Sequence, residues 1–166
     1  MIIRKSNPNG FTIVEMLMAL MIMSMLLAAV AVAVHASSIN YRQNEEMYRA
    51  MTTARAALLR ITNDIRTAQG VEVTEPADRC SMVTAAGSDV TYLYNSGDST
   101  LYLVTNDDAT DADYVLCRGV SSVVFDRATV PDDADKIRNV QISMTVTAGS
   151  NSQTVSTAVV LRKNLQ

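Results

Sequence analysis

Residues 10–17 read GFTIVEML and run directly into an apolar segment that ends near Val34. From Met16 to Val34 the only clearly polar residue is Ser24. A helix of about 20 apolar residues crosses the ~30 Å hydrocarbon core of a bilayer, so this segment predicts one transmembrane helix. A single charge, Glu15, lies at the start of the segment. Because a carboxylate is costly in hydrocarbon, we expect Glu15 to have a partner and a function.

The stretch from Gly10 to Leu17, behind a short leader that contains Arg4 and Lys5, resembles the processing site of type IV pilins and type II secretion pseudopilins. In that family a prepilin peptidase cuts after the glycine on the cytoplasmic face of the membrane and methylates the new N-terminal amine. The resemblance implies a leader of residues 1–10, cleavage between Gly10 and Phe11, and N-methylation of Phe11. It also implies that Glu15 meets the N-terminal amine of a neighbouring subunit in a filament.

Elementary electrostatics agrees with this role for Glu15. Cleavage frees an amine that is largely protonated at neutral pH, about one helical turn from the carboxylate in sequence. Pairing the two charges across subunits offsets the cost of holding either of them in lipid. Two alternatives stay open: a signal anchor in which Glu15 lies near the membrane interface, and a secretory signal cleaved near Val34-His35-Ala36.

The helix is predicted to continue beyond the membrane, because no Pro or Gly occurs from Phe11 to Gln69. Its second half is amphipathic, and Gly70 suits a C-terminal cap. A break near Ser37-Ser38 is the alternative. Apolar residues spaced three and four apart predict one buried stripe, formed by Met47, Met51, Ala54, Leu58, Ile61 and Ile65.

From Gly70 onward the apolar pattern has a period of two, which predicts strands. Two hairpins are expected, one over residues 90–104 and one over residues 137–161. The fold class is therefore α+β: a long N-terminal helix packed on an antiparallel β-sheet, as the resemblance also implies. Among its branches, the end of the helix and both hairpins are most similar to minor pseudopilin J and related pilus-assembly proteins. The expected domains are the leader (1–10), a transmembrane segment (11–35) and a head (36–166) with an amphipathic helix (36–69) and a sheet (71–162).

Charge sets the orientation and argues against one class of partner. Arg4 and Lys5 precede the apolar segment, which places the N-terminus in the cytoplasm and the head outside it. The chain has a net charge of −3, and removal of the leader with its two cations changes this to −5. A non-specific nucleic-acid binder needs a basic surface, so no nucleic-acid partner is expected.

Few residues predict further chemistry. In an extracytoplasmic head, the even count of two cysteines predicts a disulfide between Cys80 and Cys117, with two separate buried thiols as the alternative. The acidic loops at 107–113 and 132–135 are weak calcium candidates, since calcium takes several oxygen ligands, but such clusters are more often simply solvated loops. The first holds Asp107, Asp108, Asp111 and Asp113. His35 is the only histidine and no catalytic motif occurs, so no enzyme activity and no cofactor are expected.

These observations predict a minor pilin or pseudopilin, a structural subunit of a type IV pilus or a type II secretion pseudopilus. It would be a single-pass protein of the bacterial inner membrane that acts in filament initiation and protein secretion. Its expected partners are prepilin peptidase, other pilins, the inner-membrane assembly platform and membrane lipid. A component of a competence pseudopilus for DNA uptake and a membrane-anchored extracytoplasmic binding protein are the alternatives.

Overall fold

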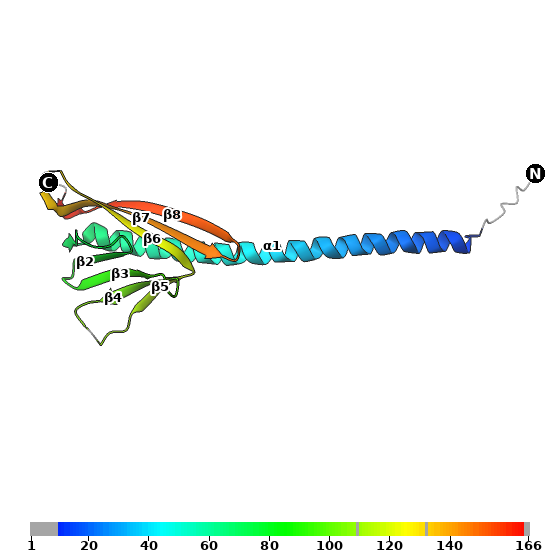
Figure 1. The fold of residues 1–166 in the computed structure, drawn as a ribbon, viewed down its shortest axis with the longest axis horizontal. Helices are drawn as coiled ribbons and strands as arrows, with labels where there is room; N and C mark the ends of the chain where they lie inside the picture. Colours follow the sequence, from blue (N-terminus) through cyan, green and yellow to red (C-terminus); the bar gives the residue numbers. More distant parts are fainter. Residues whose placement is uncertain (1–9, 109, 132, 165–166) are drawn as a thin grey trace, which may run out of the picture. The chain divides into compact units, whose positions relative to one another are not determined.

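The computed structural model describes residues 10–108, 110–131 and 133–164 (Figure 1). The expected leader up to residue 9 and Asp132 lie outside these residues. The chain divides into two compact units, residues 1–42 and 43–166, and each is considered by itself below. The second unit therefore begins at Gln43, seven residues after the expected start of the head.

One helix, α1, runs from Ile13 to Thr67 and contributes to both units. It is helical through Ser37 and Ser38, so the continuous helix is confirmed and the alternative of a break there is not. In the first unit every described residue from Gly10 to Ser38 is exposed. Such an apolar helix without cover is unusual for a soluble monomer and is typical of a surface that meets lipid or other helices. Among the described residues, α1 is also the one helix long and apolar enough to cross a membrane.

In the second unit, the predicted apolar stripe of α1 forms one side of the core. Ala54, Leu58, Ile61 and Ile65 are buried. Met47 and Met51 are partly buried against them, which confirms the stripe.

The prediction of Gly70 as the helix cap is wrong, because α1 ends at Thr67 and Gly70 begins a strand without a left-handed backbone. Hydrogen bonds of Gln69 fix the end of the helix instead. The Gln69 N–H donates to the Val83 carbonyl at 2.8 Å. The Lys163 ammonium donates to the Gln69 carbonyl at 3.0 Å.

The strands form two antiparallel sheets, where the sequence predicted one. The first has five strands in chain order. They are β1 (Gly70–Val71), β2 (Arg79–Val83), β3 (Asp89–Asn95), β4 (Thr100–Thr105) and β5 (Tyr114–Arg118). The second has three strands, β6 (Val120–Val130), β7 (Asp133–Ala148) and β8 (Asn151–Val160), followed by a short 3-10 helix, η1 (Arg162–Asn164). The chain changes sheet at Gly119, whose φ of 70° lies in the left-handed region that favours glycine.

Both sheets pack with α1 into one hydrophobic core. The largest fully buried side chains come from all three elements, with Ile61 on α1, Tyr92 on β3 and Phe125 on β6. The two predicted hairpins are present, as β3–β4 and as β7–β8. The alternation of buried and exposed residues along β7 follows directly from the period-two pattern in the sequence.

Candidate functional site

The predicted processing site lies just before the first turn of α1. Gly10 and Phe11 are exposed and precede the helix, and 79% of the surface of Phe11 is accessible. A Cβ added at Gly10 would meet nothing within 4 Å, and the residue does not have the positive φ that favours glycine. Nothing in the described fold thus requires glycine at this position.

Thr12 caps the helix at this site. Its Oγ1 accepts a hydrogen bond from the Glu15 N–H at 3.3 Å, and its carbonyl accepts one from the Met16 N–H at 3.1 Å. A threonine followed three residues later by a glutamate is the sequence signature of a capping box. This role of Thr12 was not predicted, although the spacing of Thr12 and Glu15 is visible in the sequence.

Glu15 is exposed in the first turn of α1. A negative charge at this position stabilises the helix, because it is attracted to the partial positive charge of the helix N-terminus. Its carboxylate has no hydrogen bond or ion pair among the described residues of this chain. Two physical roles are therefore available to it: stabilisation of the helix start and pairing with a cation from another molecule. The described chain supplies no cation to Glu15.

The two cysteines correct a prediction. Both thiols are free, and both are buried. Cys80 lies on β2 and Cys117 on β5, with β3 and β4 between them. Three strand spacings amount to about 14 Å, whereas a disulfide needs Cα atoms within about 7 Å. The Cys80–Cys117 disulfide therefore does not form in this fold, and the alternative of two separate buried thiols describes it.

We expect the native protein to resist alkylation by iodoacetamide at pH 8 and both cysteines to react in denaturant without added reductant. The thiolate is the reactive form, and burial raises the pKa of the Cys80 thiol to about 11, although the nearby Arg127 guanidinium opposes the rise. Native labelling of Cys80 should stay slow until the pH approaches that value. A denatured sample treated with reductant is the control. A mass gain of two hydrogens on reduction of the unlabelled protein would contradict the assignment.

Two carboxylates of the acidic loop between β4 and β5 accept hydrogen bonds from nearby protein groups, one from the start of β3 and one from the loop itself. The Asp107 carboxylate accepts from the Asp89 N–H at 2.7 Å. The Asp108 carboxylate accepts from the Thr110 hydroxyl and N–H at 2.6 and 2.9 Å, which lowers the pKa of Asp108. The remaining candidates, Asp111 and Asp113, are exposed. In the part of the chain that the structure describes, no group of three or more His, Cys, Asp or Glu side chains could hold a metal ion.

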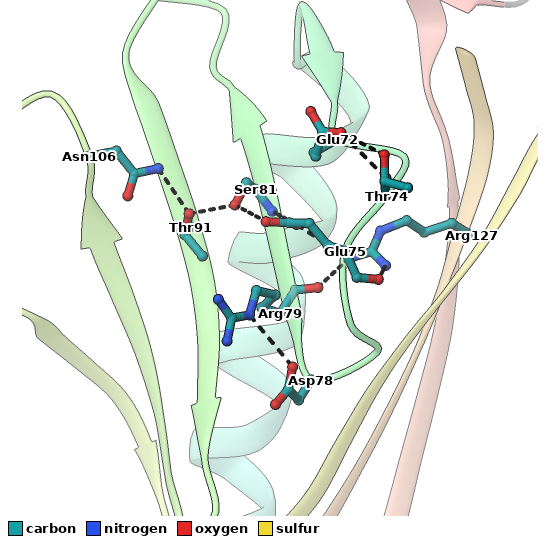
Figure 2. Close-up of polar contacts among 9 residues, drawn as sticks. All are labelled: Glu72, Thr74, Glu75, Asp78, Arg79, Ser81, Thr91, Asn106 and Arg127. Carbon is teal, nitrogen blue, oxygen red and sulfur yellow. Dashed lines mark hydrogen bonds and ion pairs between the residues drawn. The ribbon is translucent and has the colours of Figure 1, made fainter. Parts of the chain in front are cut away.

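A polar network that the sequence did not reveal joins the two sheets (Figure 2). The Arg127 side chain, on β6, is 7% exposed and lies 3.6 Å from the Glu75 carboxylate. It also donates to the Glu75 carbonyl at 3.1 Å and to the Arg79 carbonyl. The Glu75 carboxylate in turn accepts from the Ser81 N–H at 2.7 Å and the Ser81 hydroxyl at 2.5 Å. The network continues through Thr91 on β3 to Asn106.

A second polar contact joins α1 to the first sheet. The Tyr92 hydroxyl donates to the Asp64 carboxylate, and burial together with this bond raises the pKa of Tyr92. On the neighbouring turn of the helix, the Arg60 guanidinium lies 5.5 Å from the centre of the Tyr114 ring. Both contacts fix the helix against the sheet, and neither creates a reactive group.

Comparison with known proteins assigns the N-terminal part of the chain. A family model described as the prokaryotic N-terminal methylation motif matches residues 5–31. The match includes the whole stretch from Gly10 to Leu17 and most of the apolar segment. Searches of curated proteins and of solved structures find no match. The resemblance of the head to minor pseudopilin J therefore stays a prediction.

Proposed function

We propose that this protein is a minor pilin or pseudopilin, a structural subunit of a type IV pilus or of a type II secretion pseudopilus. One observation carries the proposal: the N-terminal methylation motif at residues 5–31 includes the exposed, apolar start of α1, the long helix that begins a pilin-like α+β fold. The motif points to a type IV pilin-like protein that is processed by prepilin peptidase. The role in filament initiation and secretion is the proposal.

Processing would convert the exposed chain start into a charged group. Hydrolysis of the Gly10–Phe11 peptide bond frees the Phe11 amine. The peptidase then transfers one methyl group to this amine from a sulfonium methyl donor, which leaves as a thioether, and the amine loses one proton. The Thr12 cap is retained in the product, because it lies on the mature side of the cut. The mature helix would present a cationic amine and the Glu15 carboxylate within one turn, so that subunits staggered along their axes can pair them.

The apolar half of α1 would act both before and after filament assembly. Before assembly it spans the inner membrane, with the N-terminus in the cytoplasm, as Arg4 and Lys5 favour. In the filament, the same exposed side chains would pack against those of other pilins. The inner-membrane assembly platform and membrane lipid are its other partners. A competence pseudopilus would use the same helix in the same way.

A different class of function uses the helix as an anchor alone. The residues from Gln43 onward form a compact unit with its own core, which suits an extracytoplasmic binding domain. A membrane-anchored binding protein would keep its N-terminus uncut and would need no cation for Glu15. The state of the N-terminus therefore separates the two proposals.

We expect the mature protein to begin at Phe11 and to carry one added methyl group, and we expect Gly10→Val to abolish this processing. The substitution leaves the described fold undisturbed, since the position is open and its backbone is unstrained. Intact mass spectrometry of protein purified from membranes measures both results. A conservative control, Thr12→Ser, retains the cap and should be processed normally. An unmodified chain that begins at Met1 in the functional wild-type protein would exclude the pilin proposal.

A further inference from the structure

The outer edge of β8 is a long strand edge without protection. β8 reads NSQTVSTAVV from Asn151 to Val160, with no charged residue and no proline. Natural proteins shield exposed edges with charges, prolines, short strands or covering loops, because an open edge pairs readily with another chain. β8 has neither charged residues nor prolines to shield its edge, and its Thr and Val residues favour strand formation.

The other sheet edges in the described chain are short or covered. β1 has two residues, and β5 has five and ends at Arg118. The edge of β6 is covered by connecting segments of the first sheet: the Phe125 N–H donates to the Ala77 carbonyl at 2.8 Å, and the Val120 N–H donates to the Ser99 carbonyl at 2.9 Å. The edge of β8 therefore differs from the rest in being both long and open.

The hairpin register shows which backbone groups of β8 are free. Ala148 pairs with Asn151 across a two-residue turn in which Gly149 has a φ of 59°. In such a hairpin the residues that flank the turn exchange hydrogen bonds, and alternate residues then point away from the partner strand. The N–H and C=O groups of the even-numbered residues, 152 to 158, thus point away from β7. No hydrogen bond within the described residues uses them.

A groove lies beside this edge, between β8 and the neighbouring turns of α1. It has a volume of about 340 Å³. Leu58 and Val155 give it an apolar floor, and Leu59, on its rim, is 64% exposed. Its charged residues are both cations, Arg55 and Arg66, and both are exposed. The remaining lining residues are Thr62, Ser156 and Thr157.

We propose that the edge of β8 accepts an extended acidic segment of a partner protein as an added fourth strand of the second sheet. The main-chain groups of β8 would supply the affinity, and the groove would select the side chains of the incoming strand. One apolar side chain of that strand would lie on Leu59, and carboxylates would meet the guanidinium groups of Arg55 and Arg66. This inference goes beyond the proposed function and does not depend on processing at Gly10, because all of its residues belong to the second unit.

The test uses the full chain in detergent micelles and two synthetic peptides of about seven residues, the length of a typical strand. Each peptide alternates Val and Thr, and one ends in glutamates whereas the other ends in lysines. We expect the glutamate peptide to bind, the lysine peptide to bind at least about ten-fold more weakly, and Arg55→Glu/Arg66→Glu to reverse this preference. Fluorescence anisotropy of labelled peptides measures the affinities. Arg79→Glu/Arg118→Glu, at two exposed positions of the first sheet, changes the net charge by the same amount and is the control.

A backbone variant tests the strand pairing itself. Ser156→Pro removes an N–H that points away from β7, so the hairpin is retained while the added strand loses a donor. We expect the glutamate peptide to bind this variant at least about ten-fold more weakly, whereas Ser156→Ala, which keeps the N–H, should bind as the wild type does. Bound peptide should also slow amide hydrogen exchange at Thr154, Ser156 and Ala158.

Several outcomes would overturn the inference. They are equal binding of both peptides, unchanged binding by Ser156→Pro, and no protection of the β8 edge amides. Dimerisation of the peptide-free wild type that Ser156→Pro abolishes would make a second copy of this chain, and not a separate acidic partner, the occupant of the edge.

Discussion

Replacement of Glu15 by glutamine should leave membrane insertion and processing intact but should reduce incorporation into filaments by more than about ten-fold. Transfer of an uncompensated charge into hydrocarbon costs about 2.5 kcal/mol or more, and about 1.4 kcal/mol corresponds to a factor of ten in an equilibrium. In the assembled state the mutant would leave the methylated Phe11 amine of a neighbouring subunit without its counter-charge. Glu15→Val and Glu15→Ala should have the same effect. The measurement is the ratio of sedimentable filament to total mature protein in membranes.

Glutamine is the informative replacement, because it is close to glutamate in size and helix propensity and removes only the charge. It keeps the backbone N–H that donates to the Thr12 hydroxyl, so the Thr12 cap is preserved. Thr12→Ala is the complementary control, because it removes the cap and keeps the carboxylate. If assembly depends on the charge pair, Glu15→Gln fails and Thr12→Ala succeeds. Normal assembly by Glu15→Gln together with failure by Thr12→Ala would show that assembly needs the Thr12 cap and not the charge of Glu15.

The sequence predicted the parts of the fold that local pattern controls. An apolar segment without Pro or Gly specifies a helix whatever surrounds it, and the spacing of Ala54, Leu58, Ile61 and Ile65 identified the buried face of that helix. The two hairpins could also be predicted from the sequence, because apolar and polar residues alternate in their arms and their turns hold Gly, Asn and Ser. The methylation motif could be predicted for the same reason, because it consists of consecutive residues.

The features that could not be predicted depend on contacts between segments that are distant in the sequence. Strand period alone does not say where one sheet ends, and the change of sheet at Gly119 appears only as one glycine among several. The cysteine count was compatible with a disulfide, but the order of β2 to β5 places the thiols on opposite sides of two intervening strands. Arg127 and Glu75 are 52 residues apart in sequence, and neither lies in a recognisable motif.

The second large effect is a loss of stability, which we expect when the polar network around Arg127 is broken. Arg127→Met should lower the stability of the second unit by about 3 kcal/mol. Methionine retains the buried stem but leaves the Glu75 carboxylate, 15% exposed, without its cation, and removal of one partner from a buried ion pair costs about 3–5 kcal/mol. The two bonds from Ser81 compensate the carboxylate in part and place the effect at the lower end. For a unit of this size the midpoint of thermal unfolding, followed by the near-ultraviolet circular dichroism of its tyrosines, should fall by about 10 °C.

Two matched variants decide whether the ion pair or the size of the side chain is responsible. Arg79→Met removes an arginine whose side chain is 44% exposed and 3.7 Å from Asp78, and exposed pairs contribute only about 0–1 kcal/mol. Its side chain is separate from the Arg79 carbonyl that Arg127 uses, so the network is retained. In Arg127→Met/Glu75→Leu no buried charge is left unpaired, and the double variant should be more stable than Arg127→Met alone. If the destabilisation by the double variant equalled the sum of those caused by Arg127→Met and by Glu75→Leu alone, the two charges would be energetically uncoupled.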